Sequence, residues 1–245
     1  LRVDRARAES LARAGLKMVY ISCDHPEPSG YREIRGVDGL ERVVSAIGHF
    51  RSLPRPVPVC INVAVSRMNQ DVIEELAARC IDWGVQKVQF TPVHTHLQHK
   101  DMDDSLFEPL LPVDIPQIVE SLRRAVSRLR AAGVMTNTDM FIRSLGNAYR
   151  PVRTVPCISG FLYIIISPEG EVMPCYQYPS GMSVRDAPLD EIFNSEAFRR
   201  HRLCVVNCRL PCLDTGSAEP SILFHLPYLA LHPAEALLQA RALSL

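Results

Sequence analysis

Five of the eight cysteines in this 245-residue chain gather in its C-terminal half. They are Cys157, Cys175, Cys204, Cys208 and Cys212. An iron–sulfur cluster needs about four thiolates that converge on one inorganic core. Structural zinc makes the same demand on its ligands. The group therefore predicts a metal or cluster site, with any four of the five thiols as ligands and with iron–sulfur and zinc both open.

A hairpin, a helix and a loop must bring these thiols together. Cys157 and Cys175 flank two predicted strands, Phe161–Ser167 and Glu171–Tyr176, which are joined by a turn that contains Gly170. A helix is predicted from Leu189 to Arg202. The last three cysteines follow it and are expected on a Pro-containing loop. The tail beyond about residue 216 is apolar but interrupted by prolines, so short helices are expected there.

The first 150 residues alternate between strand and helix patterns. Apolar segments predict strands at Met18–Ser22, Val57–Val65 and Val85–Val93, and the second is apolar enough to be covered on both faces. A helix is expected over about residues 4–14, and the stretch CDHPEPSGYREIRG is expected to be a polar loop. Further helices are expected to begin at the capping pairs Asp38 and Glu41, Asp71 and Glu74, and Asp114 and Gln117. Such cycles indicate βαβ units in a parallel sheet or barrel.

The C-terminal motif resembles a known family. CISGFLYIIISPEGEVMPC, then LDEIFNSEAFRRHR and CVVNCRLPC, is similar to the SPASM and twitch auxiliary iron–sulfur domains of radical S-adenosylmethionine (radical SAM) enzymes. Cys157, Gly170 and Cys175 match the first part of that pattern position by position. The closing group of cysteines is shorter than in the full SPASM pattern. The resemblance therefore implies one auxiliary [4Fe-4S] cluster rather than two.

The preceding half resembles the later part of the radical SAM barrel. The stretches that carry this likeness are AGLKMVYISCDHP…YREIRGVDGLERVVSAI and VPVCINVAVSRMNQDVIEELAARCIDWGVQKVQFTPV. In that family the strand ends face the cofactor, so the resemblance places Ser22, Asp24 and Asn62 near S-adenosylmethionine.

The implied fold class is α/β: the later part of a (βα)6-type partial TIM-like barrel, followed by a small α+β iron–sulfur domain made of a β-hairpin plus a helix. The expected domains are a partial barrel lacking its first strands over 1–150, a SPASM/twitch-like domain over 151–215, and a helical tail over 216–245.

One family feature is missing from this sequence. The CxxxCxxC motif that holds the SAM-cleaving cluster occurs nowhere in it. Together with the first residue, Leu1, this favours a partial chain that is inactive for SAM cleavage by itself. Three functions stay open: a radical SAM enzyme or its C-terminal portion, a catalytically degenerate binding module, and a zinc-stabilised structural protein.

The composition of the chain limits the classes of partner that are expected. Lys plus Arg and Asp plus Glu both number 27, so no basic excess points to nucleic acid. The longest apolar run, Phe161–Ile166, is far short of the roughly 20 residues that a membrane helix needs. A cytoplasmic protein is expected. The family resemblance implies a peptide or small-molecule substrate and an electron donor such as a flavodoxin or ferredoxin.

Other chemistry-bearing residues have simpler explanations. Cys23, Cys60 and Cys80 are scattered and are expected to be buried thiols. The loop histidines and a run of arginines on one helix face are expected to be solvated. These histidines are His94, His96 and His99, and the arginines are Arg123, Arg124, Arg128 and Arg130.

Overall fold

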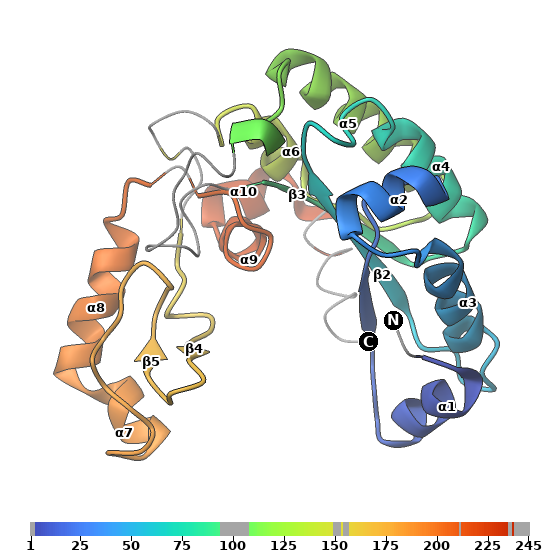
Figure 1. Cartoon of the computed structure of the whole chain (residues 1–245). Helices are drawn as coiled ribbons and strands as arrows, with labels where there is room; N and C mark the ends of the chain where they lie inside the picture. Colours follow the sequence, from blue (N-terminus) through green and yellow to red (C-terminus); the bar gives the residue numbers. More distant parts are fainter. Residues whose placement is uncertain are drawn as a thin grey trace. The chain divides into compact units, whose positions relative to one another are not determined.

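A computed structural model describes residues 3–93, 108–148, 153, 157–210, 212–234 and 237. The chain forms two compact units (Figure 1). The first is built mainly from Leu1–Val93 and Pro109–Gly146, and the second mainly from Asn147–Pro233. Each unit is considered by itself below.

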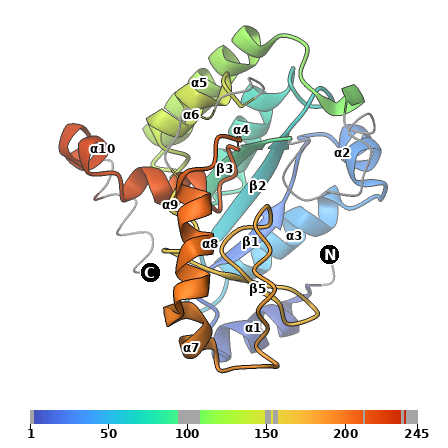
Figure 2. The same ribbon diagram turned by 90° about the vertical axis from the view of Figure 1, so that its left-hand side faces the viewer.

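The first unit contains a three-stranded parallel sheet in the order β1-β2-β3 (Figure 2). Its strands are β1 (Val19–Ser22), β2 (Val59–Val65) and β3 (Lys87–Pro92). The predicted strands are therefore confirmed in place and order, with ends trimmed by one or two residues. Met135 adds one parallel bridge to Lys87 at the β3 edge, where the Val88 N–H donates to the Met135 carbonyl at 2.9 Å. The chain at Met135 thus occupies the position of a fourth strand, next to β3.

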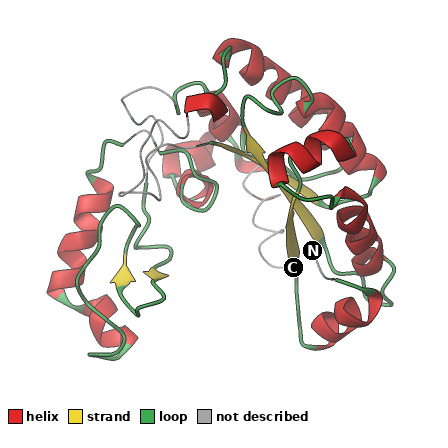
Figure 3. Ribbon diagram, in the orientation of Figure 1, coloured by secondary structure: helices red, strands yellow, loops and turns green. Residues whose placement is uncertain are grey.

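Helices cover one face of this sheet (Figures 1 and 3). The helices of the first unit are α1 (Arg5–Arg13), α2 (Pro28–Arg35), α3 (Leu40–Arg51), α4 (Ile73–Asp82), α5 (Ile115–Ala131) and α6 (Asp139–Leu145), and the short 3-10 helix η2 (Glu108–Leu110) precedes α5. Ile47 of α3, Leu76 of α4 and Leu122 of α5 are fully buried, as are Ile61 of β2 and Val88 of β3. Apolar burial on this face is the main stabilising term of the unit.

Only one of the three predicted capping pairs forms. Asp114 caps α5, and its carboxylate accepts the Gln117 N–H at 2.9 Å. The prediction for Asp38 is wrong because α3 starts one residue later, with Gly39 as N-cap, and the Asp38 carboxylate pairs with Arg32 at 3.5 Å instead. The prediction for Asp71 is also wrong, since Val72 occupies the N-cap of α4 and no side chain caps that helix.

The loop predicted after β1 contains a helix. Pro28 stands in the first turn of α2, where its missing N–H and fixed φ are tolerated, and Gly36 ends the helix with a φ of 70°. A proline followed by Ser-Gly is typical of turns, which is why the helix was not predicted from the sequence.

The second unit is small and centres on a short hairpin. Its elements are β4 (Ile165–Ile166), β5 (Val172–Met173), α7 (Leu189–Asn194), α8 (Glu196–Val206), α9 (Ala218–Leu223) and α10 (Leu226–Leu231). The predicted hairpin is confirmed as antiparallel, with strands of two residues each. The single predicted helix is two helices, because Ser195 is extended and caps α8 through the Phe198 N–H at 3.1 Å. The short helices expected in the tail are confirmed by α9 and α10.

A buried arginine fills the interior of the second unit beside its apolar core of Val172, Ile192 and Phe198. Arg202 is 9% exposed, and its guanidinium lies 4.5 Å from the ring centroid of Phe193 and 5.5 Å from that of Phe198. It also donates to the Phe193 carbonyl at 2.9 Å. Cation–π contacts therefore replace the carboxylate that a buried arginine usually requires.

Three of the four α5 arginines, Arg123, Arg124 and Arg128, are exposed as predicted, and Arg130 is half-buried. Arg124 leans toward α4 and pairs with Glu74 at 2.8 Å. Arg130 leans toward α6 and pairs with Asp139 at 2.6 Å.

No helix in the described part of the chain is long and apolar enough to span a membrane.

Candidate functional site

Four of the five C-terminal cysteines come together in the second unit. Burial raises the pKa of Cys212 above its usual range, and the neighbouring thiols Cys175, Cys157 and Cys208 raise it further. Burial likewise raises the pKa of Cys175, to which Cys157 and Cys208 add. Electrostatic interaction of this kind requires short separations inside the unit. Thiols from the hairpin and from the segment after α8 therefore share one region.

Cys204 does not share in this interaction. It is exposed and lies within α8, so the prediction of a loop position is wrong for this residue. No breaker interrupts the helix until Asn207, which leaves Cys208 as the first cysteine beyond it. Cys204 acts on Tyr178 but is absent from the causes that shift the pKa values of Cys157, Cys175 and Cys212. Cys204 thus lies exposed on α8, whereas Cys157, Cys175, Cys208 and Cys212 are half-buried outside it.

Hydrogen bonds tie the segments that carry Cys157, Cys175 and Cys208. The Ser159 hydroxyl donates to the Pro174 carbonyl at 2.8 Å, which joins the Cys157 segment to the Cys175 segment. The Tyr178 N–H donates to the Cys175 carbonyl at 2.9 Å. The Tyr178 hydroxyl hydrogen-bonds to Cys208, and that bond raises the pKa of Tyr178 to about 12.

Two glycines permit the close approach of these segments. Gly160 has a φ of 83°, and a Cβ there would lie 2.5 Å from the Pro174 Cβ, next to Cys175. Gly170 has a φ of 92° and turns the chain between β4 and β5, as the match to the motif implied. Both conformations favour glycine over any residue with a side chain.

A carboxylate that the sequence did not single out belongs to the same region. Burial raises the pKa of Asp214, while hydrogen bonds from the Ser217 hydroxyl and the backbone N–H groups of Ser217 and Gly216 lower it. Asp214 also raises the pKa values of Cys157, Cys175 and Cys212. Its position two residues after Cys212 is the only signal in the sequence that could have found it.

The described residues show no ready-made site for a single metal ion. Among the described residues, no three His, Cys, Asp or Glu side chains lie close enough together to hold a single metal. A zinc ion requires Zn–S distances of about 2.3 Å, which gathers its ligands tightly. A cluster accepts thiolates on different iron atoms of a larger core. Both kinds of site take thiolate ligands, and the match of residues 157–214 to an iron–sulfur cluster-binding domain, reported below, favours the cluster.

The first unit offers a polar sheet face on its other side. The register pairs Ser22 with Asn62, and Asn62 with Gln89, so the three residues form one row across the sheet. The Cys60 thiol points to the same row, 3.7 Å from the Gln89 Oε1 and 3.9 Å from the Asn62 Oδ1. Ala64, one alternation further along β2, is exposed. The prediction that this strand is covered on both faces is therefore wrong within this unit.

Asp24 lies buried beyond the end of β1 and is fully engaged. It is 2% exposed, its Oδ1 accepts the Ala64 N–H at 2.7 Å, and its Oδ2 pairs with Arg35 at 2.5 Å. The Asn69 amide donates to the Asp24 carbonyl at 2.9 Å and to the Ala64 carbonyl at 2.8 Å. Of the three residues assigned to the cofactor, Ser22 and Asn62 are thus neighbours on the polar face, and Asp24 fixes the adjoining strand end.

The sequence did not single out Gln89 or Asn69. Alternation of Lys87, Gln89 and Thr91 with apolar residues marks the polar face of β3 and would have found the first. No comparable signal marks Asn69, which is 1% exposed and holds a strand end through long-range contacts. The histidines His94, His96 and His99 lie outside the described residues.

Comparison with known proteins agrees with this geometry. Residues 157–214 match the SPASM family, an iron–sulfur cluster-binding domain. The chain is 29% identical over 203 residues to a PqqA peptide cyclase from Gluconobacter oxydans (strain 621H), covering 78% of this chain and 52% of that protein. It is 25% identical over 212 residues to a PqqA peptide cyclase from Xanthomonas campestris pv. campestris (strain 8004), covering 79% and 51%. The chain thus spans about half the length of these relatives.

Solved structures share the fold. Native anSMEcpe with bound AdoMet matches with a TM-score of 0.59 and 13% identity, covering 98% of this chain and 72% of that one. Native anSMEcpe with bound AdoMet and Cp18Cys peptide matches with a TM-score of 0.59 and 12% identity, covering 99% and 74%. The family match thus shows a SPASM domain over residues 157–214, the chain is similar to peptide cyclases over most of its length, and these solved structures share its fold.

Proposed function

We propose that this chain serves in the radical SAM modification of a peptide, with an auxiliary [4Fe-4S] cluster held by Cys157, Cys175, Cys208 and Cys212. The observation that carries the proposal is the match of residues 157–214 to an iron–sulfur cluster-binding domain, within which these four thiols are half-buried and Cys204 is exposed. Thiolates are the donors that iron–sulfur clusters take. When bound, such a cluster supplies one-electron transfer.

The residues around the thiols would orient and shield such a cluster. Tyr178 bonds to Cys208, and its backbone N–H holds the Cys175 carbonyl. Hydrogen bonds around ligand sulfurs tune a metal centre and fix its geometry. The half-buried setting of Cys157 and Cys175 restricts water, which favours a stable thiolate–iron core.

In the first unit, we propose that the polar row of Ser22, Asn62 and Gln89 contacts S-adenosylmethionine. These side chains supply hydroxyl and amide groups that bind polar ligand atoms. Asp24 supports this row without contacting the cofactor in the proposal, because its carboxylate accepts the Ala64 N–H and pairs with Arg35. These contacts keep the strand ends in place. Bound AdoMet is named for the solved neighbours, which supports this assignment.

The proposed domains are the partial barrel over 1–150, the auxiliary cluster domain over 151–215 and a helical tail over 216–245. A peptide is the proposed substrate class, since the similar curated proteins are peptide cyclases and one solved neighbour holds a peptide. A flavodoxin or ferredoxin is the proposed electron donor. The proposed location is the cytoplasm, whose reducing conditions keep the eight thiols free.

A second candidate is a radical-SAM-like module that binds a peptide without radical chemistry. It is favoured by the lack of a CxxxCxxC motif within these 245 residues. Sequencing the reading frame ahead of Leu1 separates the two candidates. A CxxxCxxC motif there supports the enzyme, and an uninterrupted frame without one supports the binding module.

Electron paramagnetic resonance tests the auxiliary role directly. The chain is reconstituted anaerobically with iron and sulfide, reduced with dithionite, and measured with and without S-adenosylmethionine. A [4Fe-4S] signal that S-adenosylmethionine leaves unchanged is expected, because four thiolates leave no iron open to a ligand. A signal that shifts on addition would mean an open iron and would overturn the four-thiolate assignment. A silent protein with stoichiometric zinc would support the structural zinc protein instead.

A further inference from the structure

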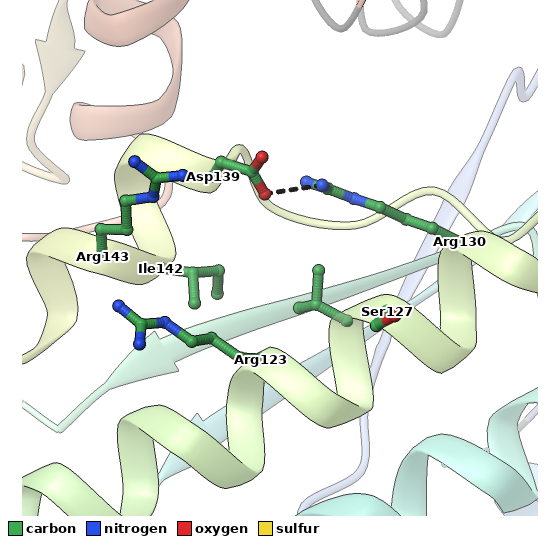
Figure 4. Close-up of a pocket in the computed structure, with 7 residues that line it drawn as sticks. Arg123, Ser127, Arg130, Asp139, Ile142 and Arg143 are labelled. Carbon is green, nitrogen blue, oxygen red and sulfur yellow. Dashed lines mark hydrogen bonds and ion pairs between the residues drawn. The ribbon is translucent and has the colours of Figure 1, made fainter.

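A cavity on the first unit, outside the sheet face and the SPASM domain, is rimmed by positive charge. It lies between α5 and α6 and encloses about 290 Å³. Three guanidinium groups line it, from Arg123, Arg130 and Arg143, against a single lining carboxylate from Asp139. Figure 4 shows Arg123 and Arg143 on either side of Ile142, with Arg130 joined to Asp139.

The three arginines differ in how they are held. Arg130 is fixed by its pair with Asp139 at 2.6 Å and by donation to the Asn137 carbonyl at 2.7 Å. Arg123 has only a loose pair with Glu120 at 3.8 Å, and both side chains are more than half exposed. Arg143 has no hydrogen bond or ion pair to any residue that the structure describes. Arg123 and Arg143 are thus the cations available to a ligand.

The rest of the lining is apolar or small. Val126 and Ile142 are buried and form aliphatic wall, and Ser127 adds one hydroxyl. The volume lies just below the range of about 300–1,000 Å³ that drug-sized ligands occupy. It suits one or two side chains rather than a nucleotide. A free inorganic anion would gain nothing from the aliphatic wall, whereas the methylenes of a glutamate would.

We propose that this cavity docks an acidic segment of a peptide, with a Glu carboxylate between Arg123 and Arg143 and an aliphatic neighbour against Val126 and Ile142. Charge complementarity identifies the occupant, because guanidinium groups bind carboxylates through paired charge-assisted hydrogen bonds. The inference rests on the proposed function only for the class of partner. It uses neither the cluster nor the polar sheet face.

Fluorescence anisotropy with the full chain tests it, using a labelled short peptide of alternating Glu and Leu at low salt. The double variant Arg123→Gln/Arg143→Gln should weaken binding about tenfold or more, as expected when charge-assisted hydrogen bonds are lost. Arg128→Gln is the matched control, because Arg128 lies on the same helix but lines no part of the cavity. It should change binding by less than about twofold.

A second pair of variants guards against indirect effects on the arginines. Ser127→Glu places a negative charge in the cavity, which repels the carboxylates of the peptide, and should abolish binding. Ser45→Glu, at an exposed position of α3, should leave binding unchanged. Equal loss in the control variants, or equal binding of a peptide with Gln in place of Glu, would overturn the proposal. Displacement by inorganic phosphate where chloride at matched ionic strength has no effect would show a small-anion site and would also overturn it. Because binding needs no iron, its failure is separable from that of the cluster.

Discussion

At the scale of single residues, Asp24 couples folding to pH. Burial is the largest influence on this carboxyl and raises its pKa above the usual value of 3.8, despite Arg35 and the Ala64 N–H. The folded state therefore binds the proton more tightly than the unfolded chain. The contribution of this group to the free energy of unfolding is therefore fully present below the pKa of the unfolded chain. It is lost as the pH rises through the higher pKa of the folded state.

The variant Asp24→Asn removes this titration and checks the sign. The free energy of unfolding of the wild type, minus that of Asp24→Asn, should decrease as the pH is raised from about 3 to 7. Urea denaturation at several pH values measures it. A difference that grows with pH would show that Arg35, not burial, dominates this carboxyl.

Gly160 is a second residue whose replacement has a defined effect. A Cβ at Gly160 would meet the Pro174 Cβ at 2.5 Å and the Arg202 Cγ at 3.1 Å, whereas at Gly181, with a φ of 71°, it would meet nothing within 4 Å. Gly181→Ala should cost only the left-handed backbone, about 1–2 kcal/mol. Gly160→Ala should cost about 1–3 kcal/mol more from overpacking.

Denaturant unfolding of the two glycine variants measures this difference. Because Pro174 precedes Cys175, Gly160→Ala should also lower the iron bound after reconstitution. Equal unfolding free energies for the two variants would mean that the hairpin shifts without strain.

At the scale of elements, the capping residues separate what sequence spacing predicts from what the fold uses. Asp114 caps α5 in the structure, but Asp71 does not cap α4, although both open a similar pattern. Asp114→Ala should therefore destabilise by about 1 kcal/mol. Asp71→Ala should stay within about 0.5 kcal/mol of the wild type. Thermal unfolding of the two variants decides, and an Asp71→Ala loss as large as that of Asp114→Ala would contradict the structure.

Helix and strand periodicity was sufficient to predict most elements of the first unit, but not their starts. Asp38 and Asp71 carry capping chemistry, yet neighbouring residues Gly39 and Val72 occupy the caps. Cap choice depends on where the preceding loop enters, which tertiary contacts such as the Asp38–Arg32 pair decide. For the same reason the sequence does not predict α2, because its first residues, Pro-Ser-Gly, are typical of turns.

The cysteines show a similar division between local and long-range information. Their number and order predicted a cluster site, and the match to SPASM agrees with it. Even spacing could not single out Cys204, because only the length of α8 decides which thiols leave the helix. Asp214 and Asn69 could not be identified from the sequence for the same reason, since their roles come from partners that folding brings near.

At the scale of the whole molecule, the two units should respond differently to metal removal. The second unit has a small apolar core around Val172, Ile192 and Phe198, and ligand binding energy in such modules is folding energy. An iron chelator should raise hydrogen exchange across residues 157–214 by about tenfold or more, and leave β1, β2 and β3 protected.

Mass-spectrometric exchange of the reconstituted chain, before and after chelation, resolves the two units. Uniform protection in both would show that the hairpin and α8 hold together without a cluster. Loss of protection confined to the first unit would contradict the assignment of metal to residues 157–214.

The four thiols of Cys157, Cys175, Cys208 and Cys212 are proposed to hold an iron–sulfur cluster. The most direct test of this assignment is the iron and acid-labile sulfide content of five single Cys→Ala variants after anaerobic reconstitution. The wild type should bind about four of each per chain. The variants at Cys157, Cys175, Cys208 and Cys212 should lose most of that iron, and Cys204→Ala should keep it. A loss in Cys204→Ala as large as in Cys175→Ala, or a colourless wild type carrying zinc, would contradict the account.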